Sequence, residues 1–102
     1  MKIQEVIVLE EVSIDLNNGR DFYNDKQAGV GDYFWDSLIA DIESLIIYGG
    51  VHKRVSGLFR MLAKRFPYAI YYEIAGNLAY VIAVLPMKRD PKWVKNQLSS
   101  RT

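Results

Sequence analysis

Apolar and polar positions along the chain change their period twice, and these changes divide the chain into predicted elements. Residues 3–9 are rich in isoleucine and valine and predict a strand. Residues 13–26 predict a first helix, with Ser13 and Asp15 as residues suited to its N-terminal cap. Gly29 follows this helix and is suited to the left-handed conformation of a C-terminal cap. The first part of the chain therefore predicts a strand followed by a helix.

A second helix, over residues 32–48, has the clearest pattern in the sequence. Asp32 is suited to cap its start, and Gly49 and Gly50 to end it. Apolar side chains recur at helical spacing along it: Phe34, Leu38, Ile42 and Leu45, with Trp35, Ile39 and Ile46 beside them. This spacing predicts one buried helix face.

After residue 50 the period changes to that of strands. The pattern predicts a strand within residues 55–65, a second over 68–75 and a third over 78–87, and side chains in the last two alternate between the two faces of the sheet. Gly76 lies in the short turn between them, where a positive φ is needed, so the two strands form a hairpin. Pro91 can occupy the first turn of a last short helix over residues 91–98.

The predicted fold class is α+β, with the order β-α-α-β-β-β and a short C-terminal helix. Two helices pack on one face of a mostly antiparallel sheet. The other face is expected to be left to water or to a partner. At 102 residues, we expect one domain that spans residues 1–102.

Composition excludes several kinds of protein. The chain has no cysteine, which rules out disulfides, thiolate catalysis and cysteine-based zinc sites. Charged residues stand at its start, where a signal peptide needs apolar ones. Its apolar runs are too short to cross a bilayer. We expect a soluble, cytoplasmic protein that does not act at a membrane.

The net charge of +1 conceals a strong asymmetry. Residues 1–50 carry three basic and ten acidic side chains, a net charge of −7. Residues 51–102 carry ten basic and two acidic side chains, a net charge of +8. This division predicts an acidic face and a basic face that meets an anionic partner. The alternative is that the two halves neutralise each other across the fold.

Three stretches, together with the order of the elements, resemble the RelE/ParE toxin superfamily. They are GRDFYNDKQAGVGDYFWDSL (residues 19–38), KRFPYAIYYEI (64–74) and VLPMKRDPKW (84–93). The most specific signal is the Arg-Phe-Pro-Tyr entry to a strand, followed about twenty residues later by Lys-Arg-Asp-Pro. The resemblance extends over nearly the whole chain.

The resemblance implies a type II toxin that is paired with a protein antitoxin in a toxin–antitoxin hetero-oligomer. RelE-like members cut messenger RNA on the ribosome, whereas ParE-like members, including plasmid stabilisation proteins, inhibit DNA gyrase and so arrest growth. No cofactor and no metal are implied. The target is therefore either gyrase or the ribosome with its messenger RNA.

The family's RNase pattern is only partly present. It assigns Arg60 and Arg89 to cationic positions and Lys95 to the position of an aromatic general acid or base. Ala69 and Leu62 stand where RelE-like members have basic residues. We therefore favour the ParE-like, non-enzymatic branch. A ribosome-dependent messenger-RNA endonuclease is the first alternative, and a decayed, non-toxic module that binds an antitoxin is the second.

A larger basic set is predicted to bind the antitoxin or the target. It comprises Lys53, Arg54, Arg60, Lys64, Arg65, Lys88 and Arg89. Type II antitoxins present an acidic, weakly ordered segment that folds on the toxin. Our hypothesis is that antitoxin and target compete for this surface. An antitoxin affinity unchanged by charge reversal at Arg60 and Arg89 would contradict it.

The remaining polar and aromatic candidates have ordinary explanations. His52, the only histidine, is interpreted as a surface or turn residue. The carboxylates of the second helix, Asp32, Asp36, Asp41 and Glu43, are interpreted as a solvated helix face, not a metal site. Tyr71, Tyr72 and Tyr80 are interpreted as sheet packing in preference to a surface that stacks on bases.

Overall fold

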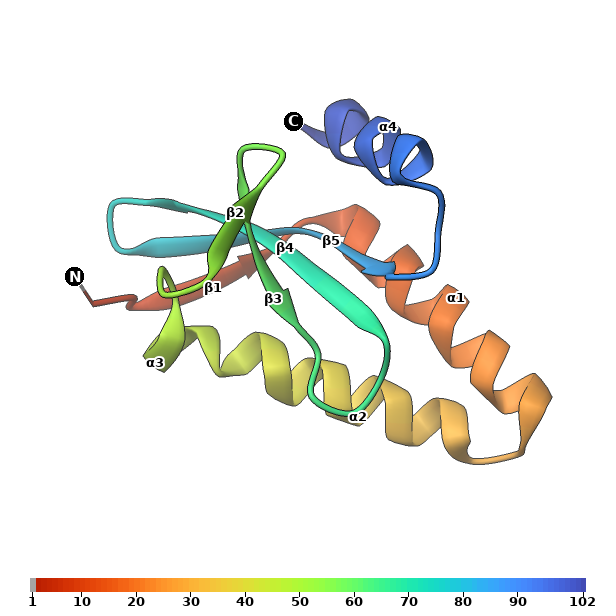
Figure 1. The fold of residues 1–102 in the computed structure, drawn as a ribbon. Helices are drawn as coiled ribbons and strands as arrows, with labels where there is room; N and C mark the ends of the chain where they lie inside the picture. The colour runs from red at the N-terminus through yellow and green to blue at the C-terminus, as the bar shows by residue number, and fades with distance from the viewer. Residues whose placement is uncertain (1) are drawn as a thin grey trace.

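The computed structural model describes residues 2–102. Five strands form one sheet in the order β1-β5-β4-β3-β2 (Figure 1). The strands are β1 Glu5–Val8, β2 Lys53–Val55, β3 Leu58–Leu62, β4 Tyr68–Ala75 and β5 Leu78–Pro86. β1 runs parallel to β5, and the other neighbouring strands are antiparallel. The predicted α+β class is confirmed.

The helices lie on both sides of this sheet. α1 Glu10–Lys26 and α2 Val30–Glu43 form a helical hairpin, and the one-turn helix α3 Leu45–Tyr48 continues α2 (Figure 1). α4 Pro91–Arg101 follows β5. No helix within residues 2–102 is both long enough and apolar enough to cross a membrane.

The helical hairpin covers one face of the sheet and builds the larger core. The predicted stripe of α2 is buried as expected, with Phe34, Leu38, Ile42 and Leu45 all within this core. These side chains pack with Val12 and Leu16 of α1 and with Ile70, Tyr72, Val81 and Val84 of the sheet. Tyr71 and Tyr72 are buried, which confirms their interpretation as sheet-packing side chains.

The opposite face is not simply left to water, which corrects the prediction. Leu98 of α4 is buried there, with Trp93 and Val94 packed beside it. They cover a second cluster of buried side chains: Leu58, Ala69, Tyr71, Ile82, Ala83 and Leu85. The sequence prediction ended α4 too early, because the helix extends beyond Leu98 to Arg101. α4 is therefore part of the packed fold.

Residues 55–65 contain a strand as predicted, β3, but the prediction missed the short strand β2 that precedes it and forms a hairpin with it. β2 and β3 pair antiparallel from Lys53–Arg60 to Val55–Leu58. Ser56 and Gly57 form the turn with φ values of 54° and 82°, the two positive angles of a type I′ turn. The hairpin places β2 at the edge of the sheet.

The start of α1 also differs from the prediction. The helix begins at Glu10, after Leu9, which donates its N–H to Val81 O of the sheet and accepts from Val12 N. A single residue, Leu9, therefore separates the end of β1 from the start of α1. Ser13 and Asp15 lie inside the helix instead of capping it, and Asp15 is buried. Gly29 has the expected positive φ, but it precedes α2 as its N-cap.

Candidate functional site

Five of the seven basic residues predicted to bind a partner line two separate hollows. Lys53, Arg60 and Lys64 line a cavity of about 450 Å³, which we call the β3 cavity. Lys88 and Arg89 line a groove of about 670 Å³ between α1 and α4, which we call the α4 groove. Arg54 and Arg65 line neither hollow.

The two halves of the chain do not neutralise each other residue by residue. Among residues 2–102, ion pairs join only Arg20 to Asp32 and Arg101 to Asp15. Of the ten basic side chains in residues 51–102, Arg101 alone is therefore engaged in an ion pair. The other nine cations of this half form no ion pair within residues 2–102.

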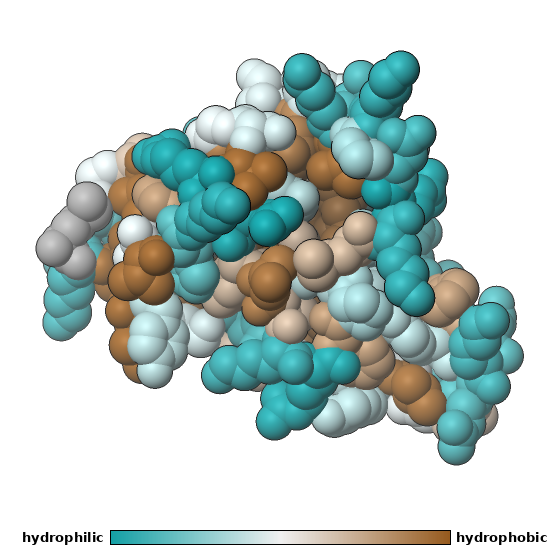
Figure 2. All heavy atoms as spheres, viewed as in Figure 1, coloured by the Kyte–Doolittle hydropathy of each residue, from teal (hydrophilic) through white to brown (hydrophobic). Residues whose placement is uncertain are grey.

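The α4 groove combines exposed apolar side chains with cations. Ile14 and Phe22 of α1 are 57% and 51% exposed on one wall. Trp93 of α4 stands on the other wall and fixes Arg89, whose guanidinium carbon stacks 3.8 Å from the ring centroid. Figure 2 shows hydrophilic side chains gathered over α4, at the upper right, with hydrophobic side chains beside them toward the middle of the molecule. Such a surface suits a partner that is both apolar and acidic.

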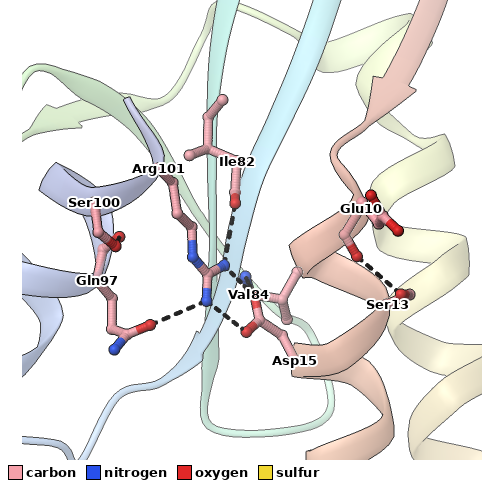
Figure 3. Close-up of polar contacts among 8 residues, drawn as sticks. All are labelled: Glu10, Ser13, Asp15, Ile82, Val84, Gln97, Ser100 and Arg101. Carbon is pink, nitrogen blue, oxygen red and sulfur yellow. Dashed lines mark hydrogen bonds and ion pairs between the residues drawn. The ribbon is translucent and has the colours of Figure 1, made fainter.

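A buried ion pair forms part of the wall of this groove (Figure 3). Arg101 donates from Nη1 to Asp15 Oδ2 at 2.6 Å and from Nη2 to Asp15 Oδ1 at 2.8 Å. The side chains of Arg101 and Asp15 are only 8% and 7% exposed. The hydrogen bonds to Asp15 raise the pKa of Arg101 above its ordinary value. The pair joins α4 to α1 across β5.

The same pair also forms hydrogen bonds with the backbone of β5, next to a bulge in this strand. Tyr72 pairs with Val81 but Tyr71 pairs with Ala83, so Ile82 is an extra residue that forms a bulge. Asp15 Oδ2 accepts from Val84 N at 2.9 Å, and Arg101 Nη1 donates to Ile82 O at 3.2 Å. The two charged side chains thus satisfy backbone groups of β5 beyond Val81, where its pairing with β1 ends.

Tyr68 lines the α4 groove at the start of β4. Burial, with smaller contributions from Tyr23 and Asp15, raises the pKa of Tyr68 to about 12. Its phenol is therefore protonated at neutral pH and does not act there as a general base.

The β3 cavity lies where α2 and α3 meet the β2–β3 hairpin. His52 is half-buried in its lining, and its Nδ1 lies 2.5 Å from Tyr72 Oη, which also accepts from Gly50 N at 2.9 Å. Burial lowers the pKa of His52. The turn interpretation of His52 did not include this contact with a residue twenty positions away.

Asp41 corrects the interpretation of the α2 carboxylates. Asp32, Asp36 and Glu43 are exposed as expected, but Asp41 is only 3% exposed. Its Oδ2 accepts from Lys64 N at 3.1 Å and so holds the segment that follows β3. The helical pattern misplaced Asp41 because its partner lies on a different element.

The candidate RNase residues lie in different surroundings. Arg60 lines the β3 cavity and Arg89 lines the α4 groove. Lys95 is exposed on α4 and lines neither hollow. Of the positions where the family pattern is broken, Leu62 is exposed near Arg60 on β3 and Ala69 is buried on β4.

Comparison with known proteins gives one informative result. No family model and no curated protein matches the sequence. Among solved structures, a chain of the chromosomal ParDE TA system from P. aeruginosa superposes with a TM-score of 0.75 at 11% identity. The match covers 84% of this chain and 98% of that chain. The architecture built from these strands and helices is therefore the ParE-like fold.

Proposed function

We propose that this chain is the toxin of a type II toxin–antitoxin pair, that it acts in the cytoplasm, and that it arrests growth by inhibiting DNA gyrase. The observation that carries the proposal is the likeness in fold to a ParDE chain over 98% of that chain's length. The resemblance of the three sequence stretches points the same way. A cognate antitoxin neutralises the toxin in a hetero-oligomer.

Gyrase is favoured over messenger RNA because the residues for RNA cleavage are dispersed. Arg60, Arg89 and Lys95 do not line a common hollow. Catalysis by general acids and bases needs these groups within hydrogen-bonding reach of one scissile phosphate. Tyr68 offers no substitute base, because its pKa is raised to about 12. Inhibition by binding needs no such convergence.

Purified protein tests the choice of target. With relaxed plasmid, ATP and gyrase, added toxin is expected to abolish supercoiling. The antitoxin, mixed with the toxin beforehand, restores it. Unchanged supercoiling, together with cleavage of messenger RNA in a translation reaction, would replace gyrase with the ribosome. Neither effect from folded protein would leave the non-toxic binding module.

We assign antitoxin binding to the α4 groove. An amphipathic acidic segment can bury apolar side chains against Ile14, Phe22 and Trp93, and can pair its carboxylates with Lys88 and Arg89. The remaining members of the basic set are Lys53, Arg54, Arg60, Lys64 and Arg65. They stay candidates for contacts with the antitoxin or the target.

Charge reversal separates the groove from the rest of the basic surface. Arg89→Glu is expected to weaken antitoxin binding by about tenfold or more, since it replaces an attraction by a repulsion at the groove wall. Lys95→Glu makes a change of equal size on α4 outside the groove and is expected to change the affinity much less. Calorimetric titration of each folded variant measures the difference. Equal losses would mean that overall charge, not the groove, determines binding.

A further inference from the structure

Tyr68 brings a hydroxyl group without a hydrogen-bond partner into the α4 groove. Its side chain is only 7% exposed and lines this groove at the start of β4. Among the tyrosine hydroxyls of residues 2–102, only that of Tyr72 forms a hydrogen bond with another residue. In this part of the chain, the side-chain polar atoms that lack both a partner and access to solvent are Arg60 Nε and Ser37 Oγ. Tyr68 Oη is not one of them, so water still reaches it.

The surroundings of this hydroxyl place it against α1 and hold it there. A Cβ added to Gly19 of α1 would lie 3.1 Å from Tyr68 Oη. The Tyr68 ring packs edge to face on Phe34, with 4.8 Å between the ring centroids, which fixes the direction of the hydroxyl. Burial raises the pKa of Tyr68, and the charges of Tyr23 and Asp15, which both line the groove, raise it further. The hydroxyl therefore keeps its proton at neutral pH and is available as a donor.

A partner that covers the groove removes the water from this donor. Apolar side chains that pack on Ile14, Phe22 and Trp93 exclude solvent from the polar groups beside them. The carboxylate of Asp15 does not take the hydroxyl, because its oxygens already accept from Arg101 and from Val84 N. A hydroxyl that loses water and gains no acceptor weakens binding roughly 5- to 150-fold. A partner that binds tightly must therefore bring its own acceptor.

We propose that the antitoxin segment in the α4 groove carries an amide or carboxylate side chain that accepts from Tyr68 Oη, and that Tyr68 thereby selects which antitoxins this toxin binds. The inference rests on the assignment of antitoxin binding to this groove. An antitoxin with an apolar side chain at the same place leaves the hydroxyl buried and unpaired, so it binds more weakly. Sites built to hydrogen-bond one polar group discriminate strongly against analogues that lack it. The apolar walls and the cations give affinity, and Tyr68 adds specificity.

Two variants that each remove one buried hydroxyl test this role. Tyr68→Phe removes the donor in the groove and keeps the ring, whereas Tyr71→Phe removes the hydroxyl of a tyrosine that is 5% exposed and lines neither hollow. In calorimetric titration with the cognate antitoxin, Tyr68→Phe is expected to raise the Kd about tenfold or more, and Tyr71→Phe less than about twofold. Circular dichroism verifies that both variants are folded. Equal effects of the two variants would overturn the proposal.

A double-mutant cycle identifies the acceptor on the antitoxin. Each Asn, Gln, Asp and Glu of the cognate antitoxin's groove-binding segment is replaced in turn by Leu or Met, and each product is titrated with the wild-type toxin and with Tyr68→Phe. One replacement is expected to weaken binding to the wild-type toxin about tenfold but to Tyr68→Phe less than about twofold, because removing both partners leaves no polar group unpaired. Identical effects of every replacement on the two toxins would overturn the proposal.

Arg89→Glu separates a failure of this inference from a failure of the groove assignment. If Arg89→Glu weakens antitoxin binding and Tyr68→Phe does not, the inference is wrong and the assignment of the groove stands. If neither variant weakens binding, the antitoxin binds elsewhere and both are wrong. The effect of the toxin on supercoiling is measured without antitoxin, so it is independent of either result.

Discussion

Replacing Arg101 with Gln is expected to lower the free energy of unfolding by about 3–5 kcal/mol. The change leaves the Asp15 carboxylate buried without its cation, and it removes the donor to Ile82 O at the β5 bulge. Because α4 covers the second core through Leu98, loss of the pair also loosens that cover. Urea unfolding, followed by tryptophan fluorescence, measures the change.

The Arg20–Asp32 pair provides the control for this prediction. Its side chains are 42% and 61% exposed, and its shortest N–O distance is 2.7 Å. Arg20→Gln is expected to cost no more than about 1 kcal/mol, since water screens an exposed pair and replaces its partner. If Arg101→Gln costs as little as Arg20→Gln, the buried pair does not hold α4 in place.

Gly31→Ala is expected to destabilise the fold by about 3 kcal/mol, although alanine is the better helix former. A Cβ at position 31 would lie 2.2 Å from Arg20 O and 2.5 Å from Asn24 Cγ. The backbone of α1 cannot move away without separating the two helices, which meet there through the Asn24 Oδ1 bond to Gly31 N. Thermal and urea unfolding both report this loss.

Gly29→Ala is the control that distinguishes the effect of a steric clash from the effect of backbone strain. Gly29 has a φ of 91°, and no neighbouring atom would lie within 4 Å of a Cβ added there, so alanine meets strain but no clash. The expected cost is about 1–2 kcal/mol. A Gly31→Ala variant no less stable than Gly29→Ala would contradict the packing account of the helical hairpin.

Local sequence patterns were sufficient to predict burial and pairing where these depend on residues of the same helix or hairpin. The helical spacing of Phe34, Leu38 and Ile42 predicted the buried face of α2, because each residue faces the sheet regardless of its exact partner. The alternation of β4 and β5 and the turn at Gly76 likewise predicted their hairpin, and Gly76 has the required positive φ. The resemblance extended these elements to the whole ParE-like fold.

Features that depend on distant partners were not predicted. Asp15 was interpreted as a cap, because nothing near it in sequence indicates Arg101, eighty-six positions away. Asp41 was interpreted as solvated, because its partner Lys64 N lies on another element. The Ser56-Gly57 turn is a local signal that was overlooked within an apolar run. The division of the basic set into two hollows required the folded arrangement.

The central claim, a ParE-like toxin that acts on gyrase, is tested most directly by induced expression in a sensitive bacterium. DNA synthesis and protein synthesis are followed separately while growth is recorded. We expect growth arrest in which DNA synthesis fails first and translation persists, and rescue by co-expressed antitoxin. Early collapse of translation would contradict the gyrase assignment and favour the endonuclease. No arrest from confirmed folded protein would contradict the toxin assignment itself.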